Sequence, residues 1–139
     1  MEIWEAVSGA EDRVRAAERV FDHQVDVETV RAFLADTRSH LLIAYVDGDP
    51  AGFVSGTELT HPDKARPELF VNELGVLGAY QSRGIGRALV SALWEIAQRR
   101  GCRGMWVLTD EANVAALKVY GATGGMRMGD QVLFQWGET

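Results

Sequence analysis

Apolar positions in the first third of the chain follow two different repeats. Residues 2–7 alternate between apolar and polar types, which predicts a short strand. Ser8 and Glu11 have the spacing of a capping box and predict the start of a helix. The apolar residues of that helix are Val14, Ala17 and Phe21. A second helix is expected after Asp26, where apolar residues again share one face. They are Val27, Val30, Phe33 and Leu34.

Two strand patterns come next, separated by turn-forming residues. Residues 40–46 are apolar and partly β-branched, and residues 51–59 repeat that character after Asp47-Gly48-Asp49-Pro50. Aspartate and glycine between two such runs are typical of a hairpin turn. Residues 61–67 are polar and flanked by proline, so we expect a loop there before the apolar run of residues 69–77.

The second half of the chain predicts a strand, a helix and a strand that form a crossover unit. The helix is expected from Arg87 to Arg100 and ends before Gly101. Its apolar stripe consists of Leu89, Ala92, Leu93, Ile96 and Ala97. The next strand is expected at residues 105–108, parallel to residues 69–77.

Two further elements are predicted near the C-terminus. Residues 113–120 fit two turns of helix, which Gly124 and Gly125 end. Residues 131–136 alternate like a closing strand. The order of elements predicts a single α/β domain over residues 1–139 with a mixed, mostly antiparallel sheet flanked by helices. Antiparallel strands come first and a parallel pair comes later.

Composition and charge narrow the class of protein. The chain is 47% apolar and carries a formal net charge of −6, which is typical of a globular protein and disfavours nucleic-acid binding, whose footprint is basic. The acidity leaves two readings open, a cationic partner or simple solubility. The sequence contains no apolar run of membrane-spanning length and no signal-peptide pattern at its start. We therefore expect a cytoplasmic protein that does not bind membranes.

Cysteine and histidine usage argues against disulfide and metal chemistry. Cys102 is the single cysteine and is expected to be a small core residue, in keeping with a reducing compartment. His23, His40 and His61 are scattered without the spacing of a metal site. We expect no metal and interpret these side chains as ordinary surface or loop histidines, with His61 kept as a candidate binding residue.

The clearest chemical signal is Gln-Ser-Arg-Gly-Ile-Gly-Arg-Ala at residues 81–88, between a predicted strand and the long helix. Gly84 and Gly86 let the backbone approach a ligand closely, while Arg83 and Arg87 add positive charge. Together with unpaired N–H groups at the helix start, they make a phosphate cradle. The pattern lacks the third glycine of a Rossmann fingerprint and the Gly-Lys-Ser/Thr of a P-loop. A tight start of a helix without a ligand is the structural alternative.

Polar residues elsewhere are expected to converge on the same crevice. Glu73 interrupts a strand that helices should cover, where a charge is costly unless it is used. Asp110 ends the neighbouring parallel strand, and ligands collect at the carboxyl ends of such strands. Asn113 and Tyr120 lie on one face of a helix. Each also has a structural reading: an outward-facing charge for Glu73, a helix cap for Asp110 and a half-buried core aromatic for Tyr120.

Three motifs occur in order along the chain. They are Leu74-Gly75-Val76, Gln81-x-x-Gly84-x-Gly86-x-Ala88-Leu89 and Asn113-x-Ala115-Ala116-x-x-x-Tyr120-x-x-x-Gly124. Together with the order of elements, they resemble the GNAT superfamily of acetyl-CoA-dependent N-acetyltransferases over most of the chain. More narrowly, three segments resemble the small aminoglycoside 3-N-acetyltransferases. These are His61-Pro62-Asp63-Lys64, Glu68-Leu69-Phe70-Val71-Asn72-Glu73 and Trp106-Val107-Leu108-Thr109-Asp110.

The resemblance implies that acetyl-CoA is the acetyl donor, released as CoA, and that no metal takes part. The parallel strands of this fold splay apart and hold the pantetheine arm, while the pyrophosphate lies at the start of the long helix. The backbone N–H near Leu74 would polarise the thioester carbonyl. The residues expected to bind the donor are Leu74, Val76, Gln81, Arg83, Gly84, Ile85, Gly86, Arg87, Ala88 and Asn113.

The resemblance also implies roles on the acceptor side. Tyr120 would be the general acid that protonates the departing thiolate, and Glu73, directly or through water, the general base. Asp110 would anchor another ammonium group and could share the base role. Glu111 and His61 complete the expected acceptor-binding set with Glu73 and Asp110.

The implied reaction is direct attack by a primary amine of a polycationic small molecule in a ternary complex. An aminoglycoside acetylated at its 3-N position is the most specific expectation. Polyamines, amino acids and protein amines are alternative acceptors, and a non-catalytic acetyl-CoA sensor is the alternative outside enzymes. Relatives often dimerise, so a homodimer is compatible with the resemblance.

Overall fold

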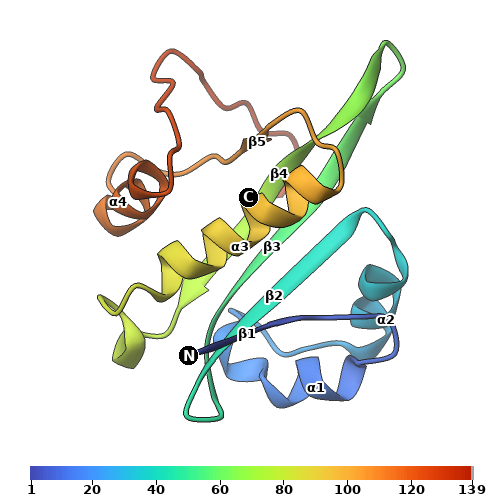
Figure 1. Cartoon of the computed structure of the whole chain (residues 1–139), viewed down its shortest axis with the longest axis vertical. Coiled ribbons are helices and arrows are strands. Elements are labelled where there is room, and N and C mark those ends of the chain that lie inside the picture. The colour runs from blue at the N-terminus through green and yellow to red at the C-terminus, as the bar shows by residue number, and fades with distance from the viewer. Residues whose placement is uncertain (139) are drawn as a thin grey trace.

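Five strands form one sheet in the order β1-β2-β3-β4-β5 (Figure 1). The structure, a computed structural model, describes residues 1–138. The strands are β1 (Glu2–Glu5), β2 (Ser39–Val46), β3 (Asp49–His61), β4 (Lys64–Val76) and β5 (Met105–Trp106). Neighbours from β1 to β4 are antiparallel, and β5 runs parallel to β4. The predicted mixed, mostly antiparallel sheet is confirmed.

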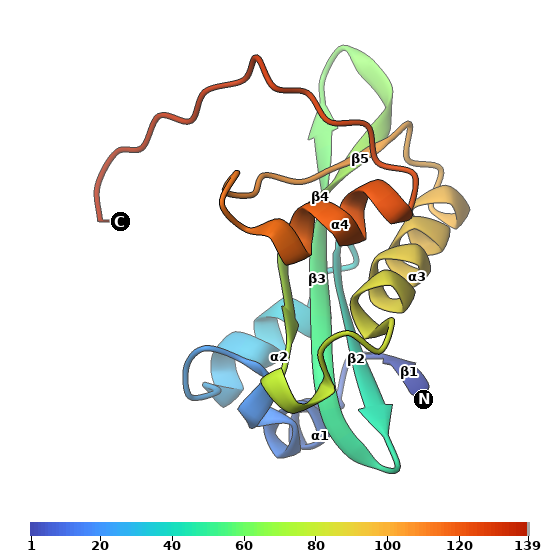
Figure 2. The same cartoon turned by 90° about the vertical axis from the view of Figure 1, so that its left-hand side faces the viewer.

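Helices cover both faces of this sheet (Figure 2). Helix α1 (Glu11–Ala16), the 3-10 helix η1 (Glu18–Val20) and α2 (Val27–Ala35) lie on one face, and α3 (Ile85–Arg99) lies on the other. Strand β2 contributes side chains to the hydrophobic core on each face of the sheet, because successive side chains of a strand point to opposite faces. Leu41 and Ile43 pack in the cluster that contains Val14 of α1. Leu42 packs in the cluster that contains Leu89 of α3.

The two hairpins differ in how well they were predicted. Asp47 and Gly48 both have positive φ, 51° and 82°, as the predicted tight turn between β2 and β3 requires. The loop predicted at residues 61–67 is wrong, because β3 and β4 continue to a turn at Pro62 and Asp63. A register shift near this end of the hairpin takes up the extra residues of β4, so the proline-flanked segment can remain in the strand.

Two other predictions are wrong. Ser8 does not cap α1: the N-cap is Ala10, whose side chain accepts no bond, and the N–H of Ala10 closes a turn on the carbonyl of Val7. Residues 131–136 form no strand and are exposed. A strand needs a partner for its backbone groups, and no other part of residues 1–138 lies beside this segment as one. Within the same described range, no helix is both long and apolar enough to cross a membrane.

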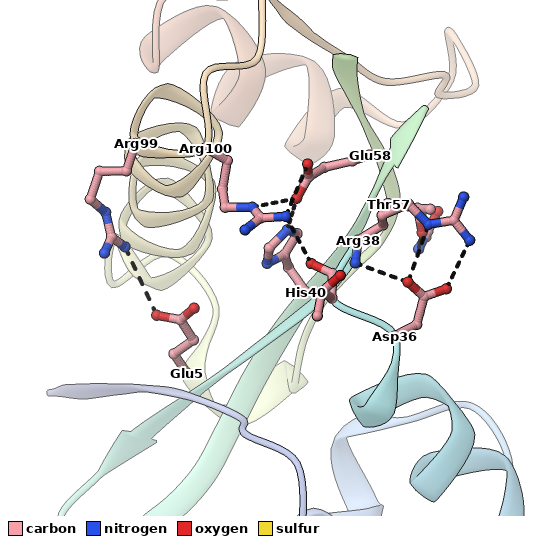
Figure 3. Close-up of polar contacts among 10 residues, drawn as sticks. Glu5, Asp36, Arg38, His40, Thr57, Glu58, Arg99 and Arg100 are labelled. Atoms are coloured by element: carbon pink, nitrogen blue, oxygen red, sulfur yellow. Dashed lines mark hydrogen bonds and ion pairs between the residues drawn. The ribbon is translucent and has the colours of Figure 1, made fainter. Parts of the chain in front are cut away.

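A buried charged cluster fastens the end of α3 to the sheet (Figure 3). His40 on β2 is 8% exposed and Glu58 on β3 is 5% exposed, and His40 Nε2 lies 2.7 Å from Glu58 Oε2. Arg100 Nε donates to the same carboxylate at 2.8 Å, and its Nη2 donates to the carbonyl of Thr37 at 3.2 Å. His40 is therefore a buried, partnered side chain, which corrects its interpretation as a surface or loop histidine.

Candidate active site

Strands β4 and β5 pair over a very short length. Leu69 lies opposite Met105 and Phe70 opposite Trp106, and the pairing goes no further among the described residues. The β5-facing edge of β4 consequently has no strand partner along residues 71–76 among the described residues. Unpaired backbone N–H and C=O groups at a strand edge are ready to bind an extended ligand.

A β-bulge lies where the two strands separate. Ser55 of β3 faces Glu73, but the next residue, Gly56, faces Val71, so Asn72 is an extra residue in β4. A bulge bends its strand and increases the local twist. The bend accounts for the end of the β4–β5 pairing and exposes the slot that the resemblance implied.

A cavity of about 770 Å³ opens at this end of β4. It lies between the end of β4, the start of α3 and the helix α4 (Val114–Ala122). Its walls are formed by Leu74, Gly75, Val76, Tyr80, Gln81, Ser82, Gly84, Ile85, Gly86, Arg87, Asn113, Val114, Ala115, Ala116, Lys118 and Val119. Most of the residues expected to bind the donor therefore face one space.

The start of α3 presents free donors to this cavity. The first helical bond runs from the N–H of Ala88 to the carbonyl of Gly84, at 3.1 Å. The N–H groups of Ile85, Gly86 and Arg87 precede that bond and have no acceptor within the helix. Ala88 was among the residues expected to bind acetyl-CoA, but its backbone N–H forms a hydrogen bond inside the helix. The N-cap Gly84 has φ 80°, a left-handed conformation that glycine adopts without strain.

The loop before α3 is held against β4. Gln81 Nε2 donates to the carbonyl of Val76 at 3.2 Å, so Gln81 positions the loop as well as lining the cavity. Ser82 has φ 62°, an uncommon conformation for a residue other than glycine. Arg83 is not among the lining residues; its guanidinium carbon lies 5.5 Å from the ring centroid of Tyr80.

Helix α4 closes the cavity from the other side. Asn113 is its N-cap, and Asn113 Oδ1 accepts the N–H of Ala116 at 3.1 Å. Gly86 allows α3 and α4 to approach closely, since a Cβ at this position would lie 3.2 Å from Cγ2 of Val119. Tyr120 follows Val119, is half-buried and does not line the cavity. Burial raises the pKa of the Tyr120 hydroxyl because it disfavours the charged phenolate.

Glu73 lies in a second cavity, of about 460 Å³, next to α1 and α2. Neighbouring residues of a strand point to opposite faces, and the lining agrees: Glu73 lines this cavity while Leu74 lines the first. The walls of the second cavity are formed by Val14, Phe21, Asp22, His23, Gln24, Val25, Asp26, Thr29, Val30, Phe33, Leu41, Phe53, Ser55 and Glu73. The two cavities therefore lie on either side of the bulged part of β4.

The sequence of residues 7–124 matches the acetyltransferase (GNAT) family. This chain belongs to that family. Its members are acetyltransferases. The splayed β4–β5 pair and the glycine-rich start of α3 are both features of the GNAT fold. No curated protein matches the chain in sequence.

Several solved structures share the fold of this GNAT domain at low sequence identity. An aminoglycoside acetyltransferase from an uncultured soil metagenomic sample, in complex with trehalose, has a TM-score of 0.88 and 18% identity, over 99% of this chain and 96% of that one. The aminoglycoside N-acetyltransferase AAC(6')-Iy with a bisubstrate analogue has 0.79 and 21%, over 99% and 98%. A ribosomal-protein-alanine N-acetyltransferase from Brucella melitensis biovar Abortus 2308 has 0.74 and 18%, over 98% and 100%.

The two cavities of the GNAT domain are lined by side chains of opposite charge. The first contains Arg87 and Lys118 and no carboxylate. The second contains Asp22, Asp26 and Glu73 and neither lysine nor arginine. Sequence reasoning missed Lys118, Asp22 and Asp26. The signal available for the aspartates was a pair of acids between two predicted helices, although Asp26 also caps α2 by accepting the N–H of Thr29 at 3.2 Å.

Three expected acceptor-binding residues line neither cavity. Asp110 Oδ1 accepts the N–H of Ala112 at 2.8 Å and orders the turn before α4, but the N-cap of that helix is Asn113, so the reading of Asp110 as a helix cap is wrong. Glu111 forms an exposed ion pair with Arg127. His61 Nε2 lies 3.1 Å from Glu68 Oε1 at the far end of the β3–β4 hairpin. In residues 1–138, no group of three or more His, Cys, Asp or Glu side chains could hold a metal ion.

Proposed function

We propose that this GNAT domain transfers the acetyl group of acetyl-CoA to a primary amine of a polycationic small molecule, most specifically an aminoglycoside. The observation that carries the proposal is the pair of oppositely charged cavities that flank the bulge of β4. A donor with phosphate groups suits the basic cavity, and an acceptor with several ammonium groups suits the acidic one. The two reactants would meet at the opening between β4 and β5, in a ternary complex.

The donor side can hold acetyl-CoA with groups that this chain already presents. The first N–H groups of α3 and the side chains of Arg87 and Lys118 suit the pyrophosphate. The free edge of β4 around Leu74 suits the amides of the pantetheine arm, which would add to β4 like a strand. The N–H of Leu74 is our candidate for polarising the thioester carbonyl.

Acid and base roles remain with Tyr120 and Glu73. A protonated amine has no lone pair, so the acceptor must lose a proton before it attacks; Glu73, directly or through a water molecule, is the candidate base. Tyr120 is the candidate acid for the departing thiolate: a phenol carries its proton at neutral pH, and burial raises the pKa of this hydroxyl further. Asp22 and Asp26 would bind further ammonium groups of the acceptor, the role first expected of Asp110.

The 3-N position of an aminoglycoside is the proposed point of attack, on the strength of the sequence resemblance. One solved relative carries a 6' designation in its name and another is named for a protein alanine substrate, so both regiochemistry and acceptor class require measurement. Because acetyl-CoA is an intracellular metabolite, we also place the reaction in the cytoplasm.

A thiol-release assay with acetyl-CoA over a panel of amines tests this proposal. The panel contains gentamicin-type aminoglycosides, spermidine, single amino acids and a peptide with a free N-terminal alanine. Turnover of the aminoglycosides, with the product shown by NMR to carry the acetyl group at 3-N, is the expected result. A 6'-N product would correct the position, and turnover confined to the peptide or to spermidine would move the acceptor class. Saturable acetyl-CoA binding without turnover of any amine would replace the enzyme by a sensor.

A further inference from the structure

Two aromatic side chains meet where β4 and β5 pair. Phe70 of β4 and Trp106 of β5 are register partners, and their ring centroids lie 4.6 Å apart at an interplanar angle of 43°. We call these two residues the aromatic pair. Phe70 is half-buried, Trp106 is 41% exposed, and Leu108 further along is 53% exposed. Exposed apolar side chains that gather in one place mark a binding site more often than ordinary surface.

The aromatic pair points to the face of the sheet on which α1 and α2 lie. The preceding residue of each strand, Leu69 in β4 and Met105 in β5, packs in the hydrophobic cluster on the α3 side. Neighbouring side chains of a strand point to opposite faces, so the aromatic pair points away from α3. Figure 2 shows α1 and α2 beside the lower part of their face, and no helix of residues 1–138 covers that face at the level of β5. A ligand can therefore reach the rings.

The bulge in β4 places the aromatic pair on the same face as Glu73. Phe70 and Asn72 lie two residues apart and share a face. Asn72 Nδ2 donates to Oγ1 of Thr57 at 2.9 Å, and Thr57 is the register partner of Phe70. In a regular strand Glu73 would point to the other face, but the extra residue pairs it with Ser55, and both line the acidic cavity. The carboxylate and the two rings thus border one surface.

The acidic cavity and the aromatic pair are a short step apart along the strands. Ser55 at the cavity and Thr57 opposite Phe70 are separated by two residues of β3, which span about 7 Å. Asn72 lies between the two places in β4, and its exposed amide can bond a ligand hydroxyl. An acceptor with its amine at Glu73 can therefore touch the rings if a second ring is joined to the part that carries the amine.

The chemistry of the aromatic pair suits a saturated ring that carries an ammonium group. A cation is attracted to an aromatic face within about 6 Å of the ring centroid, and tryptophan is the best such partner. The same face packs on the C–H groups of a saturated ring. The nearby amide of Asn72 suits the hydroxyls of such a ring rather than a purely apolar group.

We propose that the aromatic pair is a second acceptor subsite, which binds an ammonium-bearing ring joined to the ring that is acetylated at Glu73. This inference rests on the function proposed above and sharpens it, because it restricts efficient acceptors to amines with two or more linked rings. A single amino acid cannot reach both places, and a polyamine that reaches both has no ring to stack. Trp106 is thus a specificity-determining residue that lies away from the reacting atoms.

Steady-state kinetics with acceptors of different size test this subsite. Trp106→Ala is expected to raise the KM for a gentamicin-type aminoglycoside by about fivefold, the upper value for an exposed cation–π contact. The KM for 2-deoxystreptamine, the single-ring core of that acceptor, should not change. Trp106→Phe keeps an aromatic face and should restore most of the aminoglycoside KM. Equal increases for the two acceptors, or no increase for the aminoglycoside, would overturn the subsite.

Trp136→Ala is the matched control, because it removes another exposed tryptophan, one that is 87% exposed. It is expected to match the wild type with both acceptors. The KM for acetyl-CoA should be the same in all variants, which shows that the fold and the donor cavity are intact. A rise in the aminoglycoside KM for Trp136→Ala as large as that for Trp106→Ala would contradict a specific role of the aromatic pair.

Binding measured without turnover separates this subsite from the proposed function. Protein with isotope-labelled tryptophan is titrated with the aminoglycoside in the presence of CoA, and the indole N–H signal of Trp106 is identified by its loss in Trp106→Phe. A saturable shift of that signal is expected, with a much smaller one for 2-deoxystreptamine. If the shift occurs but no amine is acetylated, the proposed function fails and the subsite stands. If the aminoglycoside is acetylated without the shift, the subsite fails and the function stands; absence of both overturns both.

Discussion

Burial raises the pKa of the Tyr120 hydroxyl above its ordinary value of 10.0, because it disfavours the charged phenolate. A phenol keeps its proton throughout the neutral range even without this shift, so Tyr120 has a proton to donate. Tyr120 lies beside the donor cavity rather than in its wall. At the scale of single residues, the proposed chemistry thus rests on one protonated phenol and one exposed carboxylate, each with a separate test.

Tyr120→Phe is expected to lower kcat by about a hundredfold, the low end for general acid catalysis. The low end applies because a thiolate leaves moderately well without protonation. The ring and its packing are retained, so the KM for acetyl-CoA should change little. Steady-state kinetics check this, and an unchanged kcat would remove Tyr120 from the reaction.

Glu73→Gln is expected to lower kcat/KM by roughly a hundredfold at neutral pH, the lower end for a lost general base. The loss should shrink as the pH rises through the pKa of the acceptor amine, because a neutral amine no longer needs a base. The measurement is a pH–rate profile of both proteins with one acceptor. A profile parallel to that of the wild type would leave deprotonation to water.

At the scale of elements, α3 is held to the sheet at its C-terminal end. Its first turn faces the donor cavity, and Arg100 after its last turn reaches the carboxylate of Glu58 in β3 (Figure 3). Burial acts to raise the pKa of Glu58, but hydrogen bonds from Arg100 and His40 outweigh it and hold that pKa below its ordinary 4.5. The position of helix α4 depends on its close contact with α3 at Gly86.

Arg100→Met is expected to cost about 1–3 kcal/mol of unfolding free energy at pH 7, less than for a fully buried pair because Arg100 is partly exposed. The folded-state pKa of Glu58 lies below its unfolded value, so its stabilising effect is present above 4.5 and is lost as the pH falls through the folded pKa. The cost of the substitution should therefore diminish under acid conditions. Urea unfolding at several pH values measures it.

Arg38→Met provides the control for the charged cluster. Arg38 pairs with Asp36 at 3.2 Å, but both side chains are largely exposed (Figure 3). An exposed pair contributes little, so the expected change in unfolding free energy is much smaller than that of Arg100→Met. Equal losses in the Arg38 and Arg100 variants would contradict the special role of the buried cluster.

Alanine is expected to stabilise the protein at Gly121 of α4 and to impair donor binding at Gly86 of α3. Gly121→Ala meets no atom within 4 Å and should raise the unfolding free energy by about 0.5–1 kcal/mol, since alanine favours the helix. Gly86→Ala would contact Val119, displace α4 and raise the KM for acetyl-CoA. Unfolding curves and donor kinetics of the two variants check this. A normal donor KM for Gly86→Ala would show that the close approach of the helices is not needed.

At the scale of the whole molecule, the sheet separates two charge environments. α3 and α4 enclose the basic cavity near the end of β4, while α1 and α2 border the acidic one. The net charge of −6 does not reveal this separation, because a net charge does not say where the charged residues lie. The arrangement predicts that donor and acceptor binding respond to different substitutions.

Lys118→Met should raise the KM for acetyl-CoA, and Asp22→Asn should raise the KM for a polycationic acceptor, each by about fivefold for a loss near 1 kcal/mol. The other KM should stay unchanged in each case. Higher salt should weaken both effects, because the charges are exposed. Two-substrate kinetics on both variants provide the test, and a change of the same KM in both would contradict the separation of charge.

Much of the fold was predictable from local patterns. The turn at Asp47 and Gly48, the start of α2 after Asp26 and the end of α4 before Gly124 depend on a few neighbouring residues, and all three are confirmed. The strand expected at residues 131–136 failed for the opposite reason. A strand exists only with a partner, and its own sequence does not contain the partner's position.

The candidate site divides in the same way. The sequence by itself determined the family, the order of elements and the glycine-rich start of α3, because the periods of helices and strands and the special conformations of glycine act over a few residues. Only the tertiary structure decided which side chains share a space. Glu73 and Asp22 line the same cavity, whereas Asp110 and His61 line neither cavity. That outcome depends on the bulge at Asn72 and on strand pairing between distant segments, since which face a residue occupies changes with a shift of one residue in register.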